Sequence, residues 1–122
     1  MKLLIASVMC VSLTFTSSLL LAGMADIVDV QIVKVNADAY RFTVTVQHKD
    51  EGWDHYVDRW EVLDLEGNML GSRTIMHPHD DEQPFTRSMT LSLPMHVEKV
   101  RLRAHDTVHG YGGAEMEVAL PE

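Results

Sequence analysis

The segment YRFTVTVQ, residues 40–47, alternates apolar and polar side chains over its whole length. Tyr40, Phe42, Val44 and Val46 fall on one side of an extended chain, and the polar residues between them fall on the other. A period of two over a run of this length is typical of a β-strand with one buried face. Because the sequence shows no stripe of apolar residues at helical spacing, this segment sets the pattern for the whole domain.

The same alternation recurs along the chain, and residues that favour turns separate the runs. The predicted strands cover residues 28–35, 40–47, 56–63, 69–76, 86–93, 98–105 and 114–120. Seven short strands in roughly a hundred residues, without helices, predict an all-β antiparallel sandwich of two sheets. On the last two strands, pairing of Arg101 with Glu117 and of Arg103 with Glu115 is expected to help set the register.

The N-terminal residues 1–25 predict an export signal ahead of one domain that spans residues 26–122. Gly23 and Ala25 are small residues at the positions that a signal peptidase reads, so cleavage is expected before Asp26. An uncleaved anchor is the alternative, because about twenty apolar residues can just span a bilayer. The predicted location is periplasmic or secreted.

The amino-acid composition excludes several kinds of partner and covalent modification. The formal charge of −8, from 10 basic and 18 acidic residues, argues against nucleic acid and against anionic membrane surfaces as partners. Cys10 is the single cysteine, so an internal disulfide is excluded. Lipid attachment at Cys10 is not expected either, because Met9 stands where a small residue should precede it. The domain must therefore be held together by its apolar core.

The alternating direction of the strands predicts that histidines gather at one end of the sandwich. Loops that follow the second, fourth and sixth strands all lie at the same end when consecutive strands run in opposite directions. These loops cover residues 48–55, 77–85 and 105–111 and hold six of the seven histidines. Only His96 falls at the other end. Binding residues often sit on loops that a rigid scaffold holds.

A transition-metal site is the leading functional prediction for this end. Neutral imidazoles suit zinc and copper, and carboxylates can complete the shell or orient the histidines. The candidate ligands are His55, His77, His79, Asp80, His105, Asp106 and His109. His77 and His79, two residues apart, could direct two rings toward one ion. Zinc or copper is the expected cofactor, although neither zinc-finger spacing nor an H-E-x-x-H motif is present.

A protein or glycan partner is the alternative to a metal. Exposed aromatic side chains beside polar groups make good contact anchors. The candidates for such a surface are Trp53, Asp54, Phe85 and Tyr111. Protonation of the histidines below about pH 6.5 could also make this end a pH-dependent surface.

Enzymatic activity is the weakest of the alternatives, and no catalytic residue is predicted. Gly71, followed by His77, His79 and Glu82, is similar to the first metal motif of the cupins. The acid comes one residue early, however, and no second motif follows. The domain after residue 25 has no cysteine, and no G-x-S-x-G elbow is present.

Two charged residues interrupt the apolar face of their strands near the histidine-rich end. Asp58 shares the expected inward side of its strand with Trp60, and Arg87 shares that of Met89 and Leu91. A lone buried charge is costly, so each needs a partner. Asp58 and Arg87 are therefore expected to meet across the sandwich beneath the loops and to support the site.

Trp60, in the middle of the third strand, is where immunoglobulin-like and fibronectin-III-like sandwiches often place a buried tryptophan. The chain resembles these domains in pattern, without their cysteine pair and without a tyrosine corner, since Met95, His96 and Val97 lead into the sixth strand. The segments GWDHYVDRWEV, HPHDDEQPFTRS and RAHDTVHGYGG also look like stretches of small exported bacterial proteins of unassigned function. That resemblance implies an exported protein and no particular activity.

Overall fold

The computed structural model describes residues 23–122, and the elements within that range are seven β-strands. The elements are β1 (Asp26–Lys34), β2 (Ala39–Gln47), β3 (Val57–Leu63), β4 (Met69–Thr74), β5 (Phe85–Ser92), β6 (Lys99–Asp106) and β7 (Met116–Ala119). They confirm the predicted all-β fold and match each predicted strand within a few residues. Most of the predicted export signal lies outside the described residues. No helix in the described part of the chain is long and apolar enough to cross a membrane.

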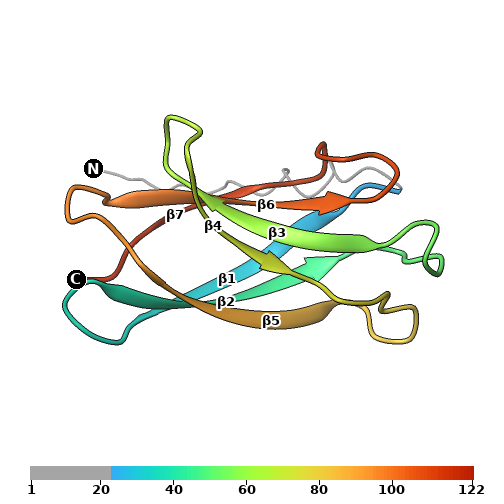
Figure 1. Ribbon diagram of the computed structural model, residues 1–122, viewed down its shortest axis with the longest axis horizontal. Coiled ribbons are helices and arrows are strands. Elements are labelled where there is room, and N and C mark those ends of the chain that lie inside the picture. The colour runs from blue at the N-terminus through green and yellow to red at the C-terminus, as the bar shows by residue number, and fades with distance from the viewer. Residues whose placement is uncertain (1–22) are drawn as a thin grey trace, which may run out of the picture.

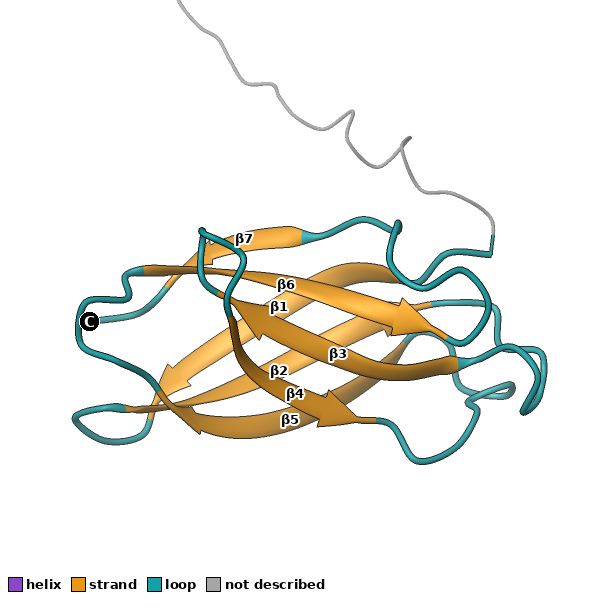
Figure 2. Cartoon of the chain, turned by 45° about the horizontal axis from the view of Figure 1, so that its top comes forward, coloured by secondary structure: helices purple, strands orange, loops and turns teal. Residues whose placement is uncertain are grey.

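The strands form two antiparallel sheets packed face to face (Figures 1 and 2). One sheet has the order β1-β2-β5 and the other the order β4-β3-β6-β7. A constant-type immunoglobulin domain keeps its fourth strand on the sheet of its first, second and fifth strands. Here β4 pairs with β3 instead, so the resemblance holds for the two-sheet architecture and for the order of the other six strands.

The apolar faces of the two sheets make the core. Phe42, Val44 and Val46 of β2 are fully buried, as the alternation of that segment predicts. Trp60 of β3 packs in the same cluster and is also fully buried. The predicted position of Trp60 in the core is therefore confirmed.

The antiparallel order brings the loops after β2, β4 and β6 to one end of the sandwich (Figure 1, right). We call this end the histidine pole; it carries His48, His55, His77, His79, His105 and His109. His96 lies in the β5–β6 loop at the opposite end. The predicted gathering of six histidines at one end is confirmed.

The register between β6 and β7 agrees with one of the two predicted charge pairs. Arg101 lies opposite Glu117. Arg103 does not pair with Glu115, because β7 begins only at Met116. Instead, Arg103 lies opposite Glu61 of β3, and its Nε donates to Glu61 Oε1 at 2.9 Å.

A register shift in β3 decides which of its polar residues point outward. The pairing with β6 is interrupted between Val57 and Arg59, as in a β-bulge, which adds a residue to one strand. Val57 and Trp60 are consequently both fully buried although three positions separate them. Asp58, between them, does not point into the core as its spacing from Trp60 predicted.

Candidate metal centre

The inward faces of β2 and β6 both end in an ionisable residue. Along β2 the buried positions Val44 and Val46 are followed by His48, which is 2% exposed just past the strand. Along β6 the buried positions Leu102 and Ala104 are followed by Asp106, which is 0% exposed. Strand periodicity therefore aims an imidazole and a carboxylate into the interior at the histidine pole.

His55, from the loop between β2 and β3, joins these two residues. Its Nε2 lies 3.3 Å from Nε2 of His48 and 3.4 Å from Oδ1 of Asp106. Nε2 of His48 lies 3.6 Å from Oδ2 of Asp106. Taking one ligand atom from each residue, all three lie within 4.8 Å of one another. His48, His55 and Asp106 form the group that we call the His–His–Asp site.

Carboxylates hold both imidazoles by their other nitrogen. His48 Nδ1 lies 2.5 Å from Oδ1 of buried Asp50, and His55 Nδ1 lies 2.8 Å from Oε1 of Glu51. Since an ionised carboxylate only accepts hydrogen bonds, each Nδ1 must carry the proton. In a neutral imidazole, Nε2 is then left with a lone pair. A carboxylate behind a histidine is also the usual support of a metal-ligating imidazole.

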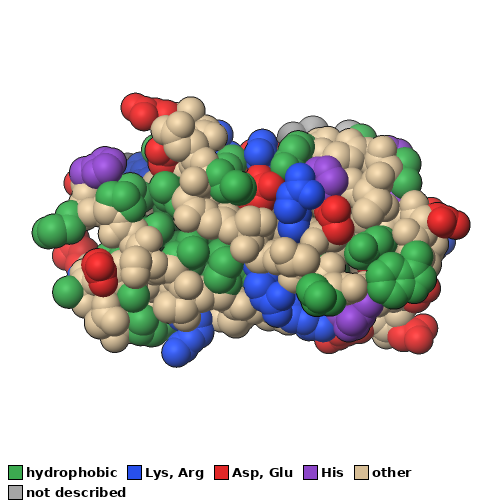
Figure 3. Space-filling model, in the orientation of Figure 1, with side chains coloured by type: hydrophobic (Ala, Val, Ile, Leu, Met, Phe, Trp, Pro, Cys, Tyr) green, Lys and Arg blue, Asp and Glu red, His purple; other side chains and the backbone are tan. Residues whose placement is uncertain are grey.

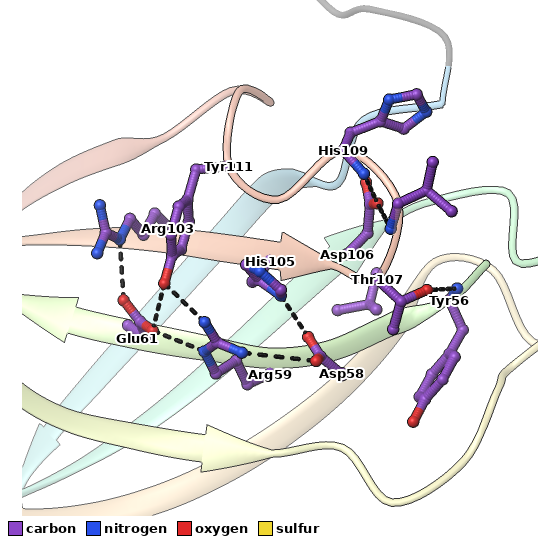
Figure 4. Close-up of polar contacts among 12 residues, drawn as sticks. Tyr56, Asp58, Arg59, Glu61, Arg103, His105, Asp106, Thr107, His109 and Tyr111 are labelled. Atoms are coloured by element: carbon purple, nitrogen blue, oxygen red, sulfur yellow. Dashed lines mark hydrogen bonds and ion pairs between the residues drawn. The ribbon is translucent and has the colours of Figure 1, made fainter. Parts of the chain in front are cut away.

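Asp106 is satisfied on one oxygen and free on the other. The backbone N–H groups of Val108 and His109 donate to Oδ1 at 2.8 and 2.6 Å (Figure 4). These bonds fix the carboxylate to the start of the β6–β7 loop. Oδ2 is buried and has no hydrogen-bond partner among the described residues. A buried unpaired carboxylate oxygen costs considerable free energy unless a cation lies beside it.

The spacing within the site matches a four-coordinate ion. With ligand bonds of about 2.1 Å, the edge of a tetrahedron around zinc measures about 3.4 Å. The two Nε2 atoms lie 3.3 Å apart, His55 Nε2 lies 3.4 Å from Oδ1 of Asp106, and His48 Nε2 lies 3.6 Å from Oδ2; each of these distances is close to that edge. Two histidines and one aspartate are also ligands that zinc and copper accept.

A fourth polar atom and a further imidazole border the site. The backbone oxygen of Gly23 lies 3.2 Å from Nε2 of His55. The ring of His109 lies 5.0 Å from that of His55, measured between centroids. Of the predicted ligands, the structure thus brings His55 and Asp106 together, with His109 next to them.

The surrounding charges and burial shift the pKa values of His55 and His79 in opposite directions. The hydrogen bond to Glu51 raises the pKa of His55, more than burial lowers it, and the bond lowers the pKa of Glu51 in turn. Burial, followed by the nearby Arg87 guanidinium, lowers the pKa of His79. His79 is therefore held in its neutral form, while His55 is held against two carboxylates.

The predicted ligands of the β4–β5 loop lie outside the His–His–Asp site, although the rings of His77 and His79 are close together, with centroids 4.8 Å apart. His79 stacks on Phe85, with ring centroids 4.4 Å apart, and its backbone N–H donates to Oδ2 of Asp50. His77 is exposed and contacts the Pro78 carbonyl. Asp80 accepts the backbone N–H of Gly52. The ring of His79 therefore packs on Phe85 of the core.

His105, another predicted ligand, also lies outside the His–His–Asp site. It precedes Asp106 on β6, so its side chain points to the outer face of the sheet. There Nδ1 of His105 lies 2.6 Å from Oδ1 of Asp58 (Figure 4). The expected contact of Asp58 with Arg87 is wrong as well, because the bulge turns Asp58 outward. Arg87 lies on the other sheet and contacts Glu82 at 3.3 Å.

Of the residues predicted for a binding surface, two are engaged in the fold. Phe85 is 1% exposed and belongs to the core. Tyr111 lies over the outer face of the sheet, where its hydroxyl donates to Glu61 Oε2 at 2.8 Å (Figure 4). Trp53 is 67% exposed, and Asp54 is exposed beside it. Trp53 is therefore the most exposed of the three predicted aromatic anchors, and Tyr111 remains 37% exposed despite its hydrogen bond.

The surface charge is unevenly distributed. On the face drawn in Figure 3, lysine and arginine side chains lie across the middle of the sandwich, whereas acidic side chains lie mostly toward its ends. Part of the basic charge of the protein is neutralised by pairing, since Arg59 and Arg103 both contact Glu61.

The comparisons with known proteins identify one relative and no family. A curated protein of Halomicrobium mukohataei named "Putative lipoprotein" is 44% identical over 94 residues, which are 77% of this chain and 46% of that protein. The chain thus spans about half the length of this relative. No protein-family model matches the chain, and no solved structure matches it.

Proposed function

We propose that the protein is an exported metal-binding domain that holds one divalent transition-metal ion, zinc or copper, at the His–His–Asp site. The observation that carries this proposal is the unpaired, buried Oδ2 of Asp106 facing Nε2 of His48. With each Nδ1 engaged by a carboxylate, the Nε2 atom of each neutral imidazole presents a lone pair toward the other ring and the Asp106 carboxylate. A metal cation at their centre would satisfy all three.

Binding, rather than catalysis, is the function we assign to the ion. The carboxylates nearest to the ligands, Asp50 and Glu51, are already engaged by the two imidazoles. They are therefore suited to orient ligands and not to exchange protons with a substrate. This role agrees with a small domain that stores, delivers or is stabilised by its metal.

Location outside the cytoplasm is part of the proposal. It rests on the signal-like residues 1–25 and on the name of the relative from Halomicrobium mukohataei, which describes that protein as a lipoprotein. Cys10 lies outside the described residues. The proposed location is periplasmic or secreted.

Metal titration of the purified protein tests this function. A ligand that binds only the folded state stabilises it by about 2.7 kcal/mol at a hundredfold excess over Kd. For a domain of this size, that free energy corresponds to a rise of roughly 10–20 °C in the thermal midpoint. After chelator treatment, zinc chloride or copper sulfate should produce such a rise and bind with a stoichiometry of one.

One histidine variant tests the metal ligands, and two others serve as its matched controls. His55→Gln should lose the metal-induced rise, whereas His105→Ala, on the outer face of the same pole, should keep it. His96→Ala, at the opposite end, should also keep it. If neither metal shifts the thermal midpoint of the wild-type protein, the metal function is wrong. In that case a proton shared between the Nε2 atoms of His48 and His55 occupies the place proposed for the metal.

A protein or glycan partner remains the second candidate, supported by the exposure of Trp53. A shallow cleft beside the indole is lined by Gly52, Trp53, His77, Pro78, His79, Asp80, Asp81 and Glu82. An aromatic wall with nearby carboxylates is suited to sugar or peptide contacts. Trp53→Ala should leave metal binding unchanged and abolish binding to such a partner, which a glycan array would measure.

A further inference from the structure

The three residues ahead of β1 are built into the folded domain. Ala25 is 2% exposed and belongs to the hydrophobic core. The chain directly after it is tied to the β6–β7 loop, since Ile27 N donates to Ala114 O at 2.9 Å and Ala114 N donates to Asp26 Oδ1 at 2.7 Å. Residues 23–25 therefore have specific neighbours.

The β6–β7 loop is shaped to receive this segment. A Cβ atom at Gly113 would lie 1.8 Å from the carbonyl oxygen of Ala25, so only glycine fits against that backbone. A Cβ atom at Gly112 would lie 3.2 Å from the sulfur of Met24. Cleavage before Asp26 would remove Ala25 from the core and leave this close-fitting surface empty.

Gly23 itself lies at the His–His–Asp site. Its carbonyl oxygen is 3.2 Å from His55 Nε2, close to the tetrahedral edge of about 3.4 Å. A Cβ atom at Gly23 would lie 2.9 Å from Nε2 of His109, and the residue has a φ of +85°. In the uncleaved chain this φ favours glycine, whereas the contact with His109 involves the movable end of a side chain. The backbone of Gly23 thus borders the His–His–Asp site on the side of His55.

We infer that the exported chain is cut between Ala22 and Gly23, and that the new N-terminus of Gly23 supplies the remaining metal ligands. This inference rests on the proposed function. Ala22, directly before the cut, is a small residue, as a signal peptidase requires there, while Leu20 occupies the third position before the cut. A signal peptidase would hydrolyse the Ala22–Gly23 bond with water, leaving a carboxylate on Ala22 and an amine on Gly23.

The released amine has the chemistry that the site lacks. An α-amino group has a pKa of about 7.7–8.0 and is readily deprotonated when a metal binds. Its nitrogen and the carbonyl oxygen of the same glycine can hold one ion in a five-membered chelate ring, so that the ion would have five ligands in place of the four of a tetrahedral site. In the unprocessed chain this nitrogen is an amide, which has no free lone pair for a metal. Processing would therefore strengthen metal binding at the site after export.

The first test is the N-terminus of the protein recovered from the exported fraction of its host. Intact-mass spectrometry should find a chain that begins at Gly23. A chain that begins at Asp26, or one that retains Met1, would overturn the inference.

The second test compares two recombinant forms released from a fusion protein, one beginning at Gly23 and the other at Ala22. They differ by one residue, yet only the first has a free amine at Gly23. Copper titration should show at least tenfold weaker binding for the form that begins at Ala22. The metal-free thermal midpoints of the two forms should agree, because Ala25 stays in place in both.

The outcomes separate this inference from the function on which it rests. Equal copper affinities of the two forms, together with loss of binding in His55→Gln, would overturn the role of the Gly23 amine and leave the His–His–Asp site intact. Absence of copper and zinc binding in the form that begins at Gly23 would overturn both. Tenfold weakening in the form that begins at Ala22 would support both.

Discussion

The Nε2 atoms of His48 and His55 face each other at 3.3 Å, and neither ring is free to turn away. Asp50 holds the first ring and Glu51 the second, each through Nδ1. Two acceptor atoms at this distance repel unless a proton or a metal lies between them. The carboxylate of Asp106 completes the same negative surroundings. A metal cation would remove this repulsion most completely, because it accepts the lone pairs of both Nε2 atoms and of the Asp106 carboxylate at once.

Replacing Asp106 with asparagine tests that argument at its most specific point. In Asp106→Asn the amide oxygen can still accept the N–H groups of Val108 and His109, so the loop should stay in place. The amide N–H₂ would occupy the position of Oδ2 and donate to Nε2 of His48. We expect loss of the zinc- or copper-induced rise, measured by thermal unfolding, without a fall in the metal-free midpoint. Retained metal affinity in this variant would show that Asp106 is not a ligand.

The strand pattern predicted the fold because burial on one face imposes a period of two wherever a strand forms. The same period also indicates two of the metal-site residues. Val44 and Val46 lead to His48, and Leu102 and Ala104 lead to Asp106. His48 was missed because it was assigned to the loop after β2, although the inward alternation continues one step beyond that strand.

The remaining errors concern features that no single-strand pattern contains. The bulge between Val57 and Arg59 depends on how β3 pairs with β6, and it turns Asp58 outward. His79 was grouped with the other histidines, but stacking on Phe85 determines its direction. Such contacts join residues that are distant in sequence or set by tertiary packing. The sequence therefore indicates which end holds the site, while the ligand set follows only from packing.

The two tryptophans should respond in opposite ways to truncation. Trp60 is fully buried, whereas Trp53 is 67% exposed. Trp60→Ala should lower the free energy of unfolding by about 3–5 kcal/mol, through lost burial and the cavity left behind. Trp53→Ala should change it by no more than about 0.5 kcal/mol. Urea unfolding measures both, and acrylamide should quench the remaining tryptophan strongly only when Trp60 is the one replaced. Equal losses would contradict the burial of Trp60.

Glu61 should make the stability of the domain depend on acidic pH. Burial alone would raise its pKa, but hydrogen bonds from Arg59, Tyr111 and Arg103 outweigh burial and lower it. Because the folded-state pKa is below the unfolded value of about 4.3, this stabilisation is complete above that pH and is lost as pH falls through the folded-state pKa. Urea unfolding between pH 6 and pH 3 should show the decline.

A variant at the same position isolates the contribution of Glu61 from that of other acids. Glu61→Gln keeps the size of the side chain but cannot ionise, so it should be less stable than wild type at pH 6. The difference between the two proteins should shrink toward pH 3. A constant difference over this range would show that the charge of Glu61 does not stabilise the fold.

Two glycine-to-alanine variants should show how firmly residues 23–25 are fitted against the β6–β7 loop. In Gly113→Ala the added Cβ meets the backbone oxygen of Ala25 at 1.8 Å, which only movement of the main chain can relieve. In Gly71→Ala the nearest atom is Cδ2 of Leu91 at 2.5 Å, which lies at the flexible end of a side chain. We expect Gly113→Ala to cost about 1–3 kcal/mol or more and Gly71→Ala to cost less, as measured by urea unfolding. Removing residues 23–25 should lower the cost of Gly113→Ala, because the obstructing carbonyl is then gone and the contact with Oδ1 of Asp26, at 2.8 Å, is with a side chain; an unchanged cost in that shortened chain would show that the segment does not pack against Gly113.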